Sequence, residues 1–170
     1  TDQQESNKYH AFFLYFAVGE TKFIKLCYNF HYLKTKISYP NIKKITGGTI
    51  MDQNRIKRNQ MLGAKIVKEL TARNMEAYYA DTKEDALKKA LELIPEGSSI
   101  SWGGSMSVNE IGLKEAVCQG NYQVYNRDTA PTPKAKREIE LAAYDCDYFL
   151  TSANAITEDG IMINIDGHSN

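Results

Sequence analysis

Two adjacent glycines, Gly103 and Gly104, lie between an apolar run that ends at Trp102 and the polar Ser105. Where a strand leads into a helix, such a pair lets the backbone come close to a ligand, and the helix N-terminus presents free N–H groups to an anion. We therefore expect Gly103, Gly104 and Ser105 to bind an anionic small molecule, such as a phosphate, a carboxylate or a CoA ester. A simple tight turn uses the same residue types, so both interpretations stay open at this stage.

Glu110 is the candidate general base near this loop, and no other catalytic residue can be named. However, Ser107-x-x-Glu110 also fits a capping box, in which the two side chains close the first turn of a helix, and this structural interpretation is the stronger one. The loop lacks both G-x-G-x-x-G and Gly-Lys-Ser/Thr. We therefore expect neither a nicotinamide site nor a P-loop.

A second polar segment extends from Thr151 to Gly167. Asp159-Gly160 within it predicts a type I′ hairpin turn. Asn and Asp are disfavoured inside strands unless they face a site or a bend, and their short side chains can hydrogen-bond a hydroxylated or phosphorylated ligand. The ligand-binding candidates of this segment are Asn154, Thr157, Asn164, Asp166 and Gly167. Arg127-Asp128 could orient an anion or form a salt pair within a turn, and His168 is expected to be exposed.

The three cysteines, Cys27, Cys118 and Cys146, are far apart and form no C-x-x-C pair. This chain alone therefore offers no zinc or iron–sulfur site, and we expect it to hold no metal and no cofactor. A sparse, odd number of cysteines suits the reducing cytoplasm. Lys and Arg together number 21, as do Asp and Glu, so the net charge is zero and nucleic acid is not an expected partner.

The longest apolar run, 11–18, is far shorter than the roughly 20 residues of a membrane-spanning helix. No small-x-small cleavage site follows it, so we expect neither a membrane span nor a secretory signal peptide.

The composition changes near Met51. Residues 1–50 contain ten of the seventeen Phe and Tyr, no Arg, and no sustained apolar periodicity. Half of them are Phe, Tyr, Asn, Lys or Ile, whose codons are richest in A and T. Gly47 and Gly48 can be encoded by a sequence resembling a bacterial ribosome-binding site ahead of a start codon at Met51. We expect 1–50 to be a translated upstream region; the alternative is an aromatic-rich extension that docks on the domain or on a membrane surface.

Residues 51–170 follow a regular pattern. Apolar residues at helical spacing, caps such as Thr82 and Thr132-Pro133, and short apolar runs alternate along the chain. The predicted strands cover 76–80, 98–102, 122–125, 147–152, 153–157 and 161–166. The first predicted helix ends near Asn74, and three further helices cover 82–94, 107–120 and 133–143. Alternating strands and helices predict an α/β domain with a three-layer, mostly parallel sheet flanked by helices.

Two motifs resemble the LUD domain of lactate-utilization proteins. They are Trp102-Gly103-Gly104-Ser105-x-Ser107-x-x-Glu110-Ile111-Gly112 and Ser152-Ala153-Asn154-Ala155-Ile156-Thr157-x-x-Gly160-x-x-x-Asn164-Ile165-Asp166-Gly167. Tyr125-Asn126-Arg127-Asp128 and Thr132-Pro133 between them also match, so the likeness covers about 52–168. The family continues beyond this Asp-Gly with a Gly-Asn-Arg-Val segment, which implies a domain incomplete at its C-terminus.

The resemblance implies the fold shared by ribose-5-phosphate isomerase, glucosamine-6-phosphate deaminase and CoA-transferases. It also implies a cluster-free component that acts with iron–sulfur subunits in the oxidation of L-lactate to pyruvate. Two alternatives remain open. The chain could be a stand-alone enzyme or binding module for a phosphorylated or CoA-linked molecule, or an interaction domain with a vestigial pocket. Neither the reaction nor the true substrate follows from the family name, and enzyme activity is left open.

Overall fold

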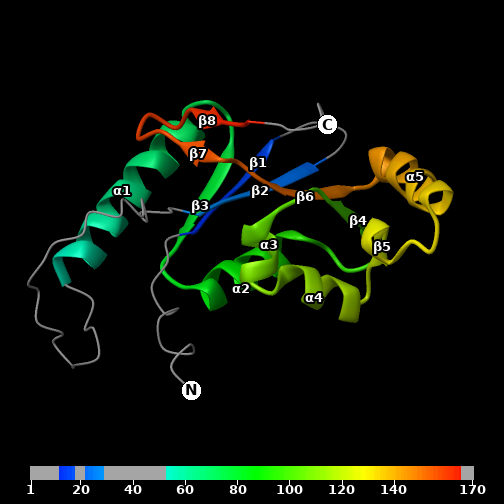
Figure 1. Cartoon of the computed structure of the whole chain (residues 1–170). Coiled ribbons are helices and arrows are strands. Elements are labelled where there is room, and N and C mark those ends of the chain that lie inside the picture. The colour runs from blue at the N-terminus through cyan, green and yellow to red at the C-terminus, as the bar shows by residue number, and fades with distance from the viewer. Residues whose placement is uncertain (1–11, 18–21, 29–52, 166–170) are drawn as a thin grey trace, which may run out of the picture.

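The computed structural model describes residues 12–17, 22–28 and 53–165 (Figure 1). Its main feature is a six-stranded sheet in the order β3-β1-β2-β6-β4-β5. All strands run in one direction except β1, which is antiparallel to both of its neighbours. The prediction of a mostly parallel α/β sheet is therefore confirmed. The strands are β1 (Phe12–Ala17), β2 (Lys22–Tyr28), β3 (Glu76–Ala80), β4 (Ser99–Trp102), β5 (Gln123–Val124) and β6 (Tyr148–Ser152).

Helices cover both faces of this sheet, as a three-layer fold requires (Figure 1). One face carries α1 (Gln53–Thr71) and the hairpin of β7 (Ala155–Ile156) and β8 (Met162–Ile163). The other carries α2 (Lys83–Leu93), α3 (Met106–Glu110) and α4 (Leu113–Gln119). The connection from β5 to β6 contains the 3-10 helix η1 (Arg127–Thr129), α5 (Pro133–Ala142) and the 3-10 helix η2 (Ala143–Asp145). The likeness to the ribose-5-phosphate isomerase fold stays a prediction.

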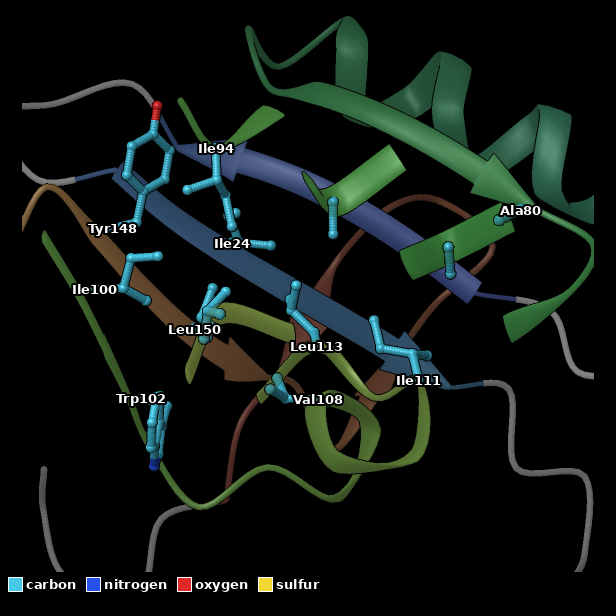
Figure 2. Packing of buried hydrophobic residues seen from close by; sticks show 13 residues of the cluster. Ile24, Ala80, Ile94, Ile100, Trp102, Val108, Ile111, Leu113, Tyr148 and Leu150 are labelled. Atoms are coloured by element: carbon cyan, nitrogen blue, oxygen red, sulfur yellow. The ribbon is translucent and has the colours of Figure 1, made fainter. Parts of the chain in front are cut away.

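The larger core lies between the sheet and α2–α4. Ile24, Leu150 and Trp102 are direct neighbours across β2, β6 and β4, so their side chains form one row on the same face. Figure 2 shows Val108 and Leu113 of the short helices packed over this row. Ile24 and Leu150 have no exposed surface. Burial of each such side chain stabilises the fold by roughly 1.5–3 kcal/mol.

The smaller core lies under α1, where Ile66 and Leu70 are buried at helical spacing. Gly63 of the same helix faces Tyr79 of β3, and a Cβ atom at this position would lie 2.3 Å from the Tyr79 ring. The missing side chain therefore lets α1 approach the sheet closely.

Two predicted helix starts are confirmed in atomic detail. Thr82 Oγ1 accepts a hydrogen bond from Asp85 N, and Thr132 Oγ1 accepts one from Ala135 N, both over 3.1 Å. Each cap satisfies one backbone N–H that the first helical turn leaves unpaired. Strand β3 also has its predicted bounds.

The prediction of one capped helix over 107–120 is wrong. Ser105, not Ser107, is the N-cap of α3, and its Oγ accepts a hydrogen bond from Val108 N over 3.2 Å. Ser107 lies inside that helix and is buried. Gly112, with φ of 75°, then separates α3 from α4. The break allows Val108 and Leu113 to face the same core, which one straight helix would not achieve.

The predicted type I′ turn at Asp159-Gly160 is also wrong. Thr157 N donates to Ile161 O, so the loop between β7 and β8 has three residues. Gly160 has φ of 73°, whereas Asp159 has a negative φ, as three-residue hairpin loops require. Arg73 Nη1 donates to Asp159 O over 2.6 Å, which fixes the loop against the end of α1. The contact with the helix selects this turn.

Residues 12–17 and 22–28 form strands in the middle of the sheet, where the sequence had shown no periodic element. A strand that is paired on both edges and lies between helical layers needs no alternation of polar and apolar residues, so it escapes a search for period two. The expected start at Met51 concerns translation rather than folding, and it stays a prediction.

A chain that begins at Met51 provides a direct test of this arrangement. Such a chain lacks Ile24 and both strands between β3 and β6, so we expect it to unfold at lower urea concentration than the full chain, with a smaller m-value. Circular dichroism during urea titration measures both quantities. Equal midpoints and m-values for the two chains would contradict the placement of β1 and β2 in the sheet.

Candidate functional site

The Gly103–Ser105 loop follows β4 at the carboxyl edge of the parallel strands, where open α/β sheets bind their ligands. Gly103 N donates to Leu150 O over 2.9 Å, so the loop begins still attached to β6. Ser101 Oγ donates to Tyr125 O over 3.2 Å and joins β4 to the residue after β5. The loop is therefore anchored on both sides where it leaves the sheet.

Neither glycine of this loop is required by the internal structure. Neither has a positive φ, and a Cβ on Gly103 would meet its nearest atom, Phe149 Cε1, at an ordinary 3.5 Å. A Cβ on Gly104 would have none of the described atoms within 4 Å. By contrast, Gly63 and Gly160 are held against neighbouring side chains. The tight-turn interpretation of Gly103-Gly104 thus has no support, and Gly104 faces open space.

Ser105 is largely buried and caps α3 with its hydroxyl oxygen. Because α3 has only five residues, its dipole is small, and it contributes less to anion binding than the predicted helix over 107–120 would have done. An anion at this loop would depend mainly on backbone N–H groups and nearby cations.

Trp102, Lys114 and Asp128 form a closed cluster directly before the loop. Trp102 Nε1 donates to Asp128 Oδ2 over 3.0 Å, and the Lys114 ammonium donates to the same oxygen. Lys114 Nζ also lies 4.8 Å from the centre of the Trp102 ring, a cation–π distance. Hydrogen bonds from Lys114 and Trp102 hold the pKa of the Asp128 carboxyl below its ordinary value. The cluster links β4, α4 and η1.

Sequence reasoning missed this cluster because its members are distant along the chain. One signal was available, since a tryptophan at a strand end needs a partner for its indole N–H. Asp128 follows the neighbouring parallel strand. Arg127 instead lies 3.7 Å from Glu140 of α5 and 4.0 Å from Asp128, so it links η1 to α5.

The second polar segment begins beside the loop and then leaves it. A Cβ on Gly103 would lie 3.7 Å from Thr151 Oγ1, but Thr157 lies in the hairpin on the α1 face. Asn154 Oδ1 accepts from Ile165 N over 2.7 Å, and Thr157 Oγ1 accepts from Ile161 N over 3.0 Å. Both side chains therefore stabilise the hairpin, which explains their presence without a ligand. Asn164 is exposed, and Asp166 and Gly167 lie outside the described residues.

Glu110 is the last residue of α3 and is partly exposed. Its capping-box explanation fails because Ser107 is not the cap. Its role as a general base stays a prediction. Across 12–17, 22–28 and 53–165, no group of three His, Cys, Asp or Glu side chains is arranged to hold a metal ion. None of the helices in these ranges is long and apolar enough to cross a membrane.

The low pKa of Asp128 predicts a pH-dependent contribution to stability. The charged carboxylate stabilises the fold above its unfolded pKa of about 3.9, and this stabilisation is lost as the pH falls through the lower folded value. Asp128→Asn should therefore lower the free energy of unfolding by about 1 kcal/mol or less at pH 6, since the pair is half-exposed, and by less at pH 3. Fluorescence of Trp102, the single tryptophan, monitors the unfolding. Asp145→Asn, at an exposed position of η2, is the control. An equal effect at both pH values in Asp128→Asn would contradict the role of the charge.

Comparison with known proteins gives a family. No curated protein and no solved structure matches the chain. The model of the LUD domain matches residues 63–170, which is more than half of the chain and includes β4, the Gly103–Ser105 loop and the hairpin. The chain therefore belongs to the LUD domain family.

Proposed function

We propose that this chain is a cluster-free component of a cytoplasmic system that oxidises L-lactate to pyruvate together with iron–sulfur subunits. The observation that carries the proposal is membership of the LUD domain family, since LUD domains are associated with lactate-utilization proteins. The anchored loop at Gly103-Gly104 supports it, because glycines let a ligand such as the carboxylate of lactate come close to the backbone.

The cysteines of the chain support a division of labour between subunits. Oxidation of lactate to pyruvate releases two electrons and two protons, which an acceptor must take. Cys118 is exposed on α4, whereas Cys146 is buried ahead of β6, and burial raises the pKa of its thiol. In the described part of the chain, neither thiol belongs to a group of three side chains that could hold a metal ion. The electrons would then pass to clusters in partner subunits.

Reconstitution tests this proposal. Iron–sulfur subunits encoded beside this chain should reduce a dye in the presence of L-lactate when the chain is included. Omission of the chain should lower the rate at least tenfold. D-lactate and a chain denatured before mixing are the controls. An unchanged rate without the chain would contradict the proposed role.

A binding module for a phosphorylated or CoA-linked molecule is the second candidate, and the geometry of Gly104 favours it. Gly104 is exposed, its missing side chain leaves open space, and the loop begins at two fixed strands. Neither the backbone conformation nor the packing requires a glycine here, and a glycine allows a ligand to contact the backbone directly. A chain that binds none of these ligands would instead fit an interaction domain with a vestigial pocket.

Gly104→Val separates ligand binding from folding. The side chain would enter open space, so we expect an unchanged melting temperature without ligand. A bound ligand stabilises a protein by about 2.7 kcal/mol at a hundredfold excess over its dissociation constant. Thermal-shift measurements with CoA esters, sugar phosphates and lactate should show this gain for the native loop and none for Gly104→Val. Gly104→Ala, with its smaller side chain, should give an intermediate gain. Equal ligand-induced stabilisation of the native protein and of Gly104→Val would contradict the proposed binding module.

A further inference from the structure

A shallow, open groove of about 390 Å³ lies along the exposed face of α1. The residues that line it share one face of the helix, at spacings of three and four, and Glu158 of the hairpin loop lies at the side. The lining residues are Asn54, Lys57, Arg58, Met61, Leu62, Lys65 and Glu158. The groove lies on the α1 side of the sheet, away from the α3–α4 side on which the Trp102 cluster lies (Figure 1).

The groove is positively charged although the whole chain is neutral. It contains three cations and one carboxylate, and that carboxylate, Glu158, lies 3.1 Å from Lys65. No carboxylate in the described part of the chain pairs with Lys57 or Arg58. The first turn of α1 has no acidic residue with which these cations could pair. The helix dipole favours negative charge at this end of the helix, so it does not explain the presence of Lys57 and Arg58.

The groove also has an apolar surface next to these charges. Met61 is 66% exposed, one turn after Lys57 and Arg58, and Leu62 beside it packs against the α1 core. Methionine adapts its shape to different partners and is frequent at binding surfaces. Two cations that pair with no carboxylate among the described residues, next to an exposed methionine, therefore fit a partner that presents acidic and apolar groups together.

We propose that this groove binds an extended acidic segment of a partner protein. Lys57 lies about 6 Å from Met61 along the helix axis, at a rise of about 1.5 Å per residue. In an extended segment, residues two positions apart point to the same side and lie about 6.6 Å apart. Positions three and five therefore match Lys57 and Met61 when position three is acidic and position five is apolar. A further acidic residue at position one then lies beyond Lys57, beside the first turn of the helix. This inference does not depend on the proposed function.

The open shape of the groove favours a peptide over a small molecule. Small ligands are usually enclosed over most of their surface, whereas this groove follows three turns of an exposed helix. The Lys65–Glu158 pair closes one end and shows that a carboxylate fits beside these lysines. Glu158 also repels a further acidic residue there, so it limits the acidic part of the segment to the Lys57 end.

Two model peptides of equal composition test the proposal on the full chain. The first contains Glu-Ser-Glu-Ser-Leu, with acidic and apolar groups on one side. The second contains Ser-Glu-Ser-Glu-Leu, with its glutamates and leucine on opposite sides. We expect NMR titration to show binding of the first, with shifts of the Lys57–Lys65 amides, and at least fivefold weaker binding of the second. Equal affinities, or no binding of the first peptide, would overturn the proposal.

Matched variants locate the effect. Lys57→Gln/Arg58→Gln should weaken binding of the first peptide roughly tenfold, the loss expected for two exposed ion pairs. Lys68→Gln/Lys88→Gln removes the same net charge outside the groove and should leave the affinity unchanged; an equal loss there would overturn the proposal. Met61→Ser should weaken binding about threefold without a change in melting temperature, because Met61 is exposed.

Two further measurements assign the groove to other occupants if the peptide proposal is wrong. Octyl phosphate that binds more tightly than the first peptide, and displaces it, would identify a small-molecule site. Sedimentation that shows a dimer lost in Lys57→Gln/Arg58→Gln would identify a second copy of the chain. Either result overturns the proposal, and neither bears on lactate oxidation or on the Gly104 loop.

Discussion

The parallel pairing of β6 with β2 on one side and β4 on the other determines the rest of the structure. Its register places Ile24, Leu150 and Trp102 side by side, and this row forms the floor on which α3 and α4 pack. The same pairing brings the carboxyl ends of the strands to one edge. A polar loop that follows β4 must then emerge beside the loops that follow β5 and β6. The direction of the strands therefore determines where the candidate site lies, whereas the residue types of the loop determine what it can bind.

Trp102 connects this core to the site. Its ring is almost completely buried, and its indole N–H donates to Asp128 in η1, which also accepts a hydrogen bond from Lys114. Gly103 and Gly104 follow at once. On their other side Ser105 begins α3 with a hydrogen-bonded cap. The loop is thus fixed at both ends, although its middle contains glycines that no packing demands. A fixed loop with an open centre binds a ligand at a small entropic cost, because the loop need not be ordered when the ligand arrives.

The sequence predicted those features that depend on neighbouring residues. The caps at Thr82 and Thr132 depend on hydrogen bonds within the first helical turn, and β3 is a short run between two helices. The structure contains all three. The errors share a nonlocal cause. Ser107 was predicted to be the cap because Glu110 lies three residues later, but Ser107 is buried inside α3 and Ser105 is the cap. The turn at Gly160 follows from its contact with α1. Likewise, nothing local could show that Trp102, Lys114 and Asp128 meet, or that 12–17 and 22–28 lie within the sheet.

The two predicted polar segments must now be weighed differently. Asn154 was proposed as ligand-binding because Asn is rare in strands, and Thr157 because it belongs to a polar segment at strand ends. Yet each accepts a backbone hydrogen bond that stabilises the hairpin. Once a structural reason is found, the unusual residue type no longer points to a ligand. For Gly103 and Gly104 the opposite holds, since the structure removes the internal reason for a glycine at both positions. The case for binding thus shifts to the carboxyl edge of β4. The hairpin, held to α1 by Arg73 and Lys65, contributes instead to the groove on the opposite face.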